Sequence, residues 1–359
     1  MDLCGNGEDK TMKALTIYGP GQIGYADVEK PVPGPLEVVA KVSYCGICGT
    51  DAEIYGGHST LYDDGLIHYP VRIGHEWSGV VESVGSEVKD LKPGDRVISD
   101  TGSTCGECEA CLSGNYKKCR KSVPLGTLDD CHDGAFAEYE CMWHWHFHKV
   151  EDGTDLMEAA LVEPATISWN ALIEANVKKD EVLVITGTGA IGLSAVTLAK
   201  KIGAKVYLAG RKKMKLEAGR KMGADEIIDL SETTLTDYFV AHDLSVDVLY
   251  ETTGHLPFIY ETMDCLSYGG RVALLSFYDQ KLDNVDLSKM VRLHQSILGI
   301  EGSGWRAPEV LSMLGKGEIS LAPMITQVVP FSKAAESVAS SQTNTAEKIK
   351  VMVDVSRWE

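Results

Sequence analysis

Residues 180–203, DEVLVITGTGAIGLSAVTLAKKIG, decide the fold of this chain. An apolar run is followed by glycines at positions 187, 189 and 192, and then by apolar residues at helical spacing. This order predicts a buried strand, a tight glycine turn and a helix that begins at the turn. The first glycine permits the turn, the second lets a pyrophosphate approach the backbone, and the third lets the helix pack on the strand. The stretch predicts a dinucleotide site, and the alternative is a glycine-rich turn without a ligand.

The sequence that follows repeats this alternation. Strand-like runs KVYLA, DEIIDL, VDVLYET and GRVALLSF are separated by helical stretches. Strands that alternate with helices predict a parallel sheet covered on both faces. We therefore expect an α/β protein with a doubly wound Rossmann domain at residues 165–300.

The rest of the chain has a different pattern. Residues 12–150 alternate short β-branched runs with Gly and Pro turns, which predicts a β-rich domain. The tail ends in the strand-like KIKVMVDV and is expected to return to that domain. We expect the β-rich domain to comprise residues 1–164 and 301–359, and the 359-residue length suits two domains.

We expect the dinucleotide to contact the glycine turn and Thr253, which follows VDVLYE. The turn residues are Gly187, Thr188, Gly189, Ala190, Ile191 and Gly192. The strand KVYLA is followed by Gly210, Arg211 and Lys212, where an acid would bind the ribose 2′-hydroxyl of NAD. Two cations suit a 2′-phosphate, so the sequence predicts a preference for NADP. The alternative is a basic start to a surface helix, with NAD accepted.

Four of the ten cysteines lie within fifteen residues. Their spacing is C-x2-C-x2-C-x7-C, and four thiolates close a tetrahedral zinc site with no open position. This pattern predicts a structural zinc lobe at residues 100–120, with an iron–sulfur site or chance as the alternatives. The cysteines are Cys105, Cys108, Cys111 and Cys119.

Composition excludes several other classes of protein. The net charge of −18 disfavours nucleic acid as a partner. The first residues lack a basic segment followed by an apolar stretch, and no run of about 18 apolar residues occurs. We therefore expect a cytoplasmic protein without a secretory signal or a membrane partner.

Further motifs carry a family resemblance. Cys48 lies in CGICGTD, His75 and Glu76 lie in GHEWSG, and Glu163 lies in VEPATISWNAL. With the cysteine lobe and the glycine turn in the same order, residues 12–355 resemble a zinc-containing medium-chain dehydrogenase. The resemblance favours the branch of sorbitol, butanediol, galactitol-phosphate and threonine dehydrogenases. It implies a GroES-like catalytic domain beside the Rossmann domain, and a homodimer or homotetramer.

The resemblance also implies a second, catalytic zinc, so that each chain would hold two zinc ions. Cys48, His75 and Glu76 would be its ligands, and Glu163 would bind it directly or through its water. Such a set leaves a position open for substrate. Thr50 would receive the alcohol proton, and the alternative role for this residue is to cap a turn.

Three features depart from the resemblance or stand outside it. Glu53 lies where relatives often carry a histidine of the proton path, so it is either a relay or a surface acid. Glu301 and Arg306 lie where sugar-alcohol relatives place other substrate contacts. The segment WHWHFH at 143–148 is interpreted as a strand, with a histidine metal site as the less favoured alternative.

Together these observations predict a zinc enzyme that moves a hydride between NADP(H) and a small secondary alcohol or its ketone. Polyols, sugars, cyclitols and sugar phosphates are the expected substrates. A threonine-type amino-alcohol dehydrogenase and a simple alcohol dehydrogenase share these motifs and stay as alternatives. A dinucleotide-binding protein without catalysis is the remote alternative, and the complete ligand set argues against it.

Overall fold

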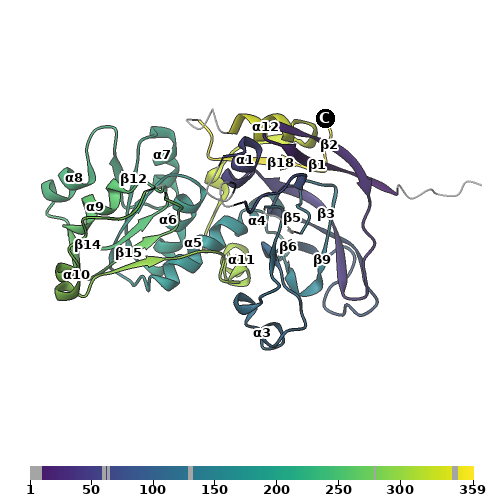
Figure 1. Cartoon of the computed structure of the whole chain (residues 1–359), viewed down its shortest axis with the longest axis horizontal. Helices are drawn as coiled ribbons and strands as arrows, with labels where there is room; N and C mark the ends of the chain where they lie inside the picture. Colours follow the sequence, from purple (N-terminus) through teal and green to yellow (C-terminus); the bar gives the residue numbers. More distant parts are fainter. Residues whose placement is uncertain (1–9, 59–61, 63–64, 128–131, 279, 342–346) are drawn as a thin grey trace, which may run out of the picture. The chain divides into compact units, whose positions relative to one another are not determined.

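The structure is a computed structural model that describes residues 10–58, 62, 65–127, 132–278, 280–341 and 347–359 (Figure 1). Contacts divide the chain into two compact units. The first comprises Met1–Leu161, Gln327–Asn344 and Val351–Glu359, and the second comprises Val162–Thr326 and Thr345–Lys350. None of the helices in the described ranges is long and apolar enough to cross a membrane.

The first unit is built on β-sheets, as the β-branched runs predict. Its largest sheet has the strand order β10-β6-β5-β3-β18-β17, and β9 also pairs with β3. The central strands β3 and β5 are antiparallel. The strands of this sheet are β3 (Glu37–Gly46), β5 (Glu76–Val84), β6 (Arg96–Ser99), β9 (Tyr139–Trp143), β10 (Phe147–Lys149), β17 (Ile325–Pro330) and β18 (Lys350–Asp354).

Smaller elements complete the first unit. A three-stranded sheet has the order β2-β1-β4, and β7 pairs with β8. The strands are β1 (Thr11–Gly19), β2 (Gln22–Glu29), β4 (Val71–Arg72), β7 (Gly102–Ser103) and β8 (Val123–Pro124). The helices are α1 (Gly49–Gly56), α3 (Glu109–Leu112), α4 (Leu156–Ala159) and α12 (Ala334–Ser341), with 3₁₀ turns η1 (Tyr116–Lys118), η2 (His144–His146) and η4 (Phe331–Lys333). Trp77 and Phe136 lie in the hydrophobic core of this unit, which positions β5 firmly.

The second unit is the doubly wound fold that residues 180–203 predict. Six parallel strands have the order β13-β12-β11-β14-β15-β16. The strands are β11 (Val182–Thr186), β12 (Lys205–Gly210), β13 (Glu226–Asp229), β14 (Val246–Glu251), β15 (Leu266–Leu274) and β16 (Ser296–Gly299). The order reverses between β11 and β14, and a crevice at such a reversal is where ligands bind in open α/β sheets.

Helices cover both faces of this sheet (Figure 1). The helices of this unit are α5 (Val162–Glu174), α6 (Ala190–Ile202), α7 (Lys213–Lys221), α8 (Leu235–Ala241), α9 (Pro257–Met263) and α10 (Leu287–Leu293), together with α11 (Ala307–Gly315), which packs on α5, and the 3₁₀ turn η3 (Ala322–Met324). The contacts place residues 301–326 with this unit, whereas the sequence places its end at residue 300. The cause is long-range packing: α11 lies against α5, and the Asn170 side chain donates to the Gly302 carbonyl at 3.1 Å.

Candidate zinc and dinucleotide sites

The predicted catalytic ligands Cys48, His75 and Glu76 meet in the first unit. Cys48 follows β3, and Glu76 begins β5 directly after His75. Because β3 and β5 pair with Gly46 opposite Glu76, these residues lie at the same end of the pair. One ligand atom from each residue lies within 4.8 Å of those from the other two. Such a cluster of thiolate, imidazole and carboxylate fits zinc and leaves room for one further ligand.

Two glycines leave the space that this cluster needs. A Cβ on Gly46 would lie 2.3 Å from Glu76 Oε2. Gly74, with φ of +105°, precedes His75, and a Cβ there would lie 2.6 Å from the Phe136 backbone nitrogen. Side chains at either position would displace a ligand or the backbone that carries one.

Asp51 supports the cluster and is a residue that sequence reasoning missed. Its carboxylate is fully buried, accepts from the Cys48 backbone N–H at 2.8 Å and lies 3.9 Å from His75 Nδ1. A carboxylate beside a ligating histidine orients the ring and raises its basicity. The signal in the sequence is its position in CGICGTD, three residues after Cys48, which is the spacing of a helix-capping acid.

Thr50 and the exposed Glu53 lie on α1, which begins directly after Cys48. Thr50 Oγ1 is 3.7 Å from Cys48 Sγ. Glu53 is three residues further along the helix and therefore on the same side. Desolvation raises the pKa of Glu53, and the nearby His58 partly opposes this effect. A raised pKa suits a carboxyl group that exchanges protons near neutral pH.

Glu163 lies in the second unit, in the first turn of α5. The cluster of three ligand atoms does not include it. Its role as the fourth ligand stays a prediction.

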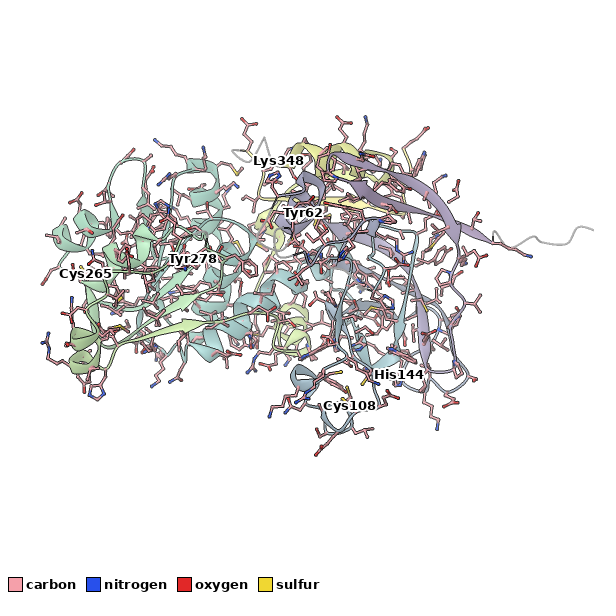
Figure 2. All side chains as sticks on the ribbon, in the orientation of Figure 1. Tyr62, Cys108, His144, Cys265, Tyr278 and Lys348 are labelled. Atoms are coloured by element: carbon pink, nitrogen blue, oxygen red, sulfur yellow. The ribbon has the colours of Figure 1, made fainter. Side chains whose placement is uncertain are left out.

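The four-cysteine lobe has the geometry that its spacing predicts. Sγ–Sγ distances are 3.5 Å for Cys108–Cys111, 3.6 Å for Cys105–Cys119 and 3.9 Å for Cys105–Cys111, and all four cysteines are free thiols. The backbone N–H of Glu107 is the main cause that lowers the pKa of Cys105 to about 6. Figure 2 shows the sulfur atoms gathered around the labelled Cys108. Four converging sulfurs fit a closed zinc site.

The WHWHFH segment corrects the expectation of a continuous strand. β9 ends at Trp143, His144–His146 form the 3₁₀ turn η2, and β10 begins at Phe147. The three histidines bind nearby acids and backbone, and His146 Nδ1 also lies 3.5 Å from Asp100. His144 pairs with Asp90 at 2.9 Å, His146 Nε2 accepts from the Thr104 N–H at 2.9 Å, and His148 pairs with Asp100 at 2.9 Å.

This segment instead packs against the cysteine lobe. The Trp143 and Trp145 rings stack with centroids 5.1 Å apart. Trp145 lies over Gly106, where a Cβ would be 2.5 Å from the indole. The His146 ring centroid lies 6.4 Å from that of Tyr116, which belongs to η1 just before Cys119. The segment therefore packs against the lobe near its first cysteine, at Gly106, and near its last cysteine, at Tyr116.

The glycine turn in the second unit has the conformation that a dinucleotide requires. Gly187 has φ of +107°, and a Cβ there would lie 2.2 Å from Thr252 Oγ1. A Cβ on Gly192 would lie 2.1 Å from the Gly187 carbonyl oxygen, so the third glycine permits close packing of helix on turn. Gly189 is the N-cap of α6, and no described atom lies within 4 Å of the place its side chain would take. The N–H groups of this helix start suit an anion.

The end of β12 lacks room for an acid. A Cβ on Gly210 would lie 2.6 Å from the Thr188 methyl group. Arg211 and Lys212 are exposed, and Lys212 is the N-cap of α7. Lys215, which sequence reasoning missed, is partly buried, and desolvation followed by the charge of Lys212 lowers its pKa. No carboxylate of the described residues forms an ion pair with any of these three cations.

Thr253 and Arg306, two further residues singled out in the sequence, form hydrogen bonds or ion pairs within the second unit. Thr253 follows β14, and its N–H and hydroxyl both donate to Glu251. Arg306 pairs with Glu309 at 2.8 Å and donates to Asn170 Oδ1 at 3.2 Å. These bonds tie Arg306 to α11 and α5 within its own unit.

Comparison with known proteins shows the family of the chain. Residues 34–152 match the family model described as alcohol dehydrogenase GroES-like domain, and residues 190–315 match the model described as zinc-binding dehydrogenase. The chain is 30% identical to a sorbitol dehydrogenase of Halalkalibacterium halodurans, covering 95% of this chain and 99% of the relative. It is 30% identical to an L-threonine 3-dehydrogenase of Enterobacter sp., covering 92% of this chain and 98% of the relative.

Solved structures give the same result. A crystal structure from E. coli CFT073, described as an alcohol dehydrogenase complexed with NADH, has a TM-score of 0.87 at 28% identity and covers 96% of this chain and 99% of its own. A zinc-binding dehydrogenase from Sinorhizobium meliloti bound to NADP has a TM-score of 0.86 at 26% identity, with the same coverage of both chains. The chain therefore belongs to the zinc-containing medium-chain dehydrogenase family, in its polyol and threonine dehydrogenase branch, and is an oxidoreductase that acts on CH–OH groups.

Proposed function

We propose that this enzyme transfers a hydride between NADP(H) and a small secondary alcohol or its ketone, at a zinc held by Cys48, His75 and Glu76, with Glu163 bound to it directly or through its water. The observation that carries the proposal is the convergence of the first three ligand atoms within 4.8 Å. A second zinc in the four-cysteine lobe is structural in this proposal, which gives two zinc ions per chain.

The chain's own residues have distinct tasks in this reaction. When bound, zinc supplies a Lewis acid for the substrate oxygen, and the nicotinamide accepts or gives the hydride. Cys48 and Glu76 are anionic ligands that moderate the charge of the ion, and Asp51 orients His75. Thr50, beside Cys48, receives the alcohol proton. Glu53, with its raised pKa, is positioned on the same side of α1 to pass the proton to solvent.

The preference for NADP rests on the surface that follows β12. Arg211, Lys212 and Lys215 place three cations near the expected 2′-phosphate, and a phosphate is well bound by guanidinium and ammonium donors. Thr188 occupies the space beside Gly210 that an NAD-binding acid would need. One solved relative contains NADH and the other contains NADP, so the relatives do not indicate which cofactor this chain prefers. The proposed preference for NADP therefore rests on the residues that follow β12.

The substrate class follows from the branch. Relatives are named for sorbitol, D-arabitol phosphate and L-threonine. We propose a polyol, sugar, cyclitol or sugar phosphate as substrate, with a threonine-type amino alcohol or a simple alcohol as the second candidate. Assays of zinc-replete enzyme with polyols, ketoses, cyclitols and amino alcohols, each with NADP(H) and NAD(H), test the proposal. A higher kcat/KM with NAD across the panel would contradict the cofactor assignment.

We also propose a homodimer or homotetramer. Helix α10 has no buried residue, and its Leu287 and Val291 side chains are 71% and 77% exposed. Exposed apolar side chains next to the last strand of a sheet are typical of an interface. Sedimentation velocity should give an oligomer for the parent enzyme and a smaller species for the double variant Leu287→Glu, Val291→Glu. A monomeric parent would contradict this assignment.

A further inference from the structure

Glu251, the last residue of β14, is a fully buried acid that no part of the reaction above employs. A buried carboxylate is costly unless hydrogen bonds replace its hydration. No lysine, arginine or histidine in the described parts of the chain forms an ion pair with Glu251. Its described hydrogen-bond partners are neutral groups, and their positions show what the residue holds together.

The donors lie in or directly beside three loops of the second unit. Glu251 Oε1 accepts from the Thr253 N–H at 2.7 Å, from the Thr253 hydroxyl and from Thr186 Oγ1 at 3.3 Å. Oε2 accepts from the Gly254 N–H at 3.0 Å and from the Tyr278 hydroxyl. Burial and the neighbouring Glu251 raise the pKa of Tyr278, which keeps this phenol protonated as a donor.

Each of these loops leaves the carboxyl end of a strand near the reversal of strand order. Thr186 ends β11 and precedes Gly187, the first glycine of the dinucleotide turn. Thr253 and Gly254 follow β14, and Tyr278 follows β15. Figure 2 labels Tyr278 among the side chains of this unit.

The loops also contact one another directly. Thr252 donates to the Thr186 carbonyl from its N–H at 3.1 Å and from its hydroxyl at 2.7 Å. A Cβ on Gly254, which has φ of +72°, would lie 2.5 Å from the Phe277 carbonyl oxygen. A shift of the loop after β14 would therefore move both the glycine turn and the loop after β15.

We propose that Glu251 is a positioning residue that holds these three loops in the geometry that receives the dinucleotide before it binds. This inference rests on the proposed function, because it requires a dinucleotide at the carboxyl edge of the sheet. Ordering loops in advance lowers the entropy cost of binding. The hydrogen bonds around Glu251, called the Glu251 clamp below, lie beside the glycine turn that would hold the pyrophosphate. Because NAD and NADP share the pyrophosphate, the clamp should affect the binding of both dinucleotides equally.

Substitution by glutamine should break the clamp. Each carboxylate oxygen of Glu251 accepts a backbone N–H, from Thr253 on one side and Gly254 on the other. An amide has one NH₂ group, which would face a backbone donor in either orientation. Tyr278→Phe is milder, because it removes one hydroxyl donor and leaves the carboxylate in place.

Tyr260→Phe is a matched control. The Tyr260 hydroxyl donates to Asp283 Oδ1 at 2.7 Å and accepts from the Asp283 N–H at 3.0 Å, which is also a tyrosine–carboxylate contact in the second unit. It joins α9 to the segment before α10, away from the donors that surround Glu251.

The experiment is a fluorescence titration of the zinc-replete enzyme with NADPH and with NADH, together with zinc content and Tm. We expect Tyr278→Phe to raise both Kd values by about fivefold and Glu251→Gln by about tenfold or more, with unchanged zinc content. Tyr260→Phe should leave both Kd values as in the parent.

Unchanged Kd values in folded Tyr278→Phe would overturn the inference, and so would an equal rise in Tyr260→Phe. If Glu251→Gln fails to fold, Tyr278→Phe decides the result. A parent enzyme that binds neither dinucleotide would contradict the proposed function itself and this inference with it, which is distinguishable from a parent that binds normally.

Discussion

At the residue scale, the ligands and their supports differ in how far the sequence reveals them. Cys48, His75 and Glu76 belong to motifs that keep their order in the chain, so the family resemblance alone identifies them. The supporting role of Asp51 is recognised from its burial and its position 3.9 Å from His75 Nδ1, and that of Glu251 from its hydrogen bonds to neutral donors. Asp51 has the spacing of a helix-capping acid, whereas Glu251 has no sequence pattern that distinguishes it from a surface residue.

The cofactor assignment belongs to single side chains and predicts a selective loss. Arg211→Ala should lower kcat/KM with NADP by about tenfold or more and change the value with NAD by less than about twofold, because only the 2′-phosphate loses a charged partner. Steady-state kinetics with both cofactors measure this. Arg220→Ala is the control, since Arg220 lies at the last turn of α7. Equal losses with both cofactors would refute a 2′-phosphate contact.

The raised pKa of Glu53 predicts how the rate of alcohol oxidation depends on pH. Its pKa is raised, so it stays protonated to a higher pH than an ordinary glutamate and accepts a proton only above that pKa. Alcohol oxidation in the parent should therefore rise as pH passes through this pKa. Glu53→Gln should remove that limb of the kcat profile and lower kcat by about tenfold or more at its optimum. A profile identical to the parent's would end the relay role.

At the scale of elements, strands with a strong pattern are well predicted and short turns are not. The alternation after residue 180 gives the parallel sheet, because buried strands and amphipathic helices have distinct periods. The turn η2 has no such period, so the sequence of residues 143–148 predicts a continuous strand, which His144–His146 interrupt with a 3₁₀ turn. The destination of α11 likewise depends on Asn170 and Gly302, which are far apart in sequence.

Because η2 packs against the cysteine lobe, we expect the lobe to hold zinc less tightly when a contact between them is removed. His146→Ala removes the acceptor of the Thr104 N–H, next to Cys105, and should speed release of the lobe zinc to a chelator by about tenfold. His146→Asn should restore part of the retention, because its amide oxygen can accept that bond. His144→Ala, whose partner is Asp90 at the surface, serves as control. Equal release rates for all variants would exclude this support.

At the scale of the whole molecule, the sequence predicts two domains and the return of the tail strand. β18 pairs with β3 at Met352 and Gly46, so the last strand lies beside the strand that leads to Cys48. The two kinds of site thus depend on different parts of the chain. The cluster of Cys48, His75 and Glu76 comes from strand pairing over a long sequence separation, whereas the glycine turn is local and forms within residues 187–192. The local site is the one that sequence reasoning describes most fully.

The central claim is that one of two zinc ions sits in an open site and carries the reaction. Metal analysis of the parent and of His75→Ala, with activity measured on the same samples, tests it most directly. We predict about two zinc ions per parent chain, and about one in His75→Ala with hydride transfer reduced by about a thousandfold or more. A variant that keeps both zinc ions and its activity, or an active parent with a single zinc, would contradict it.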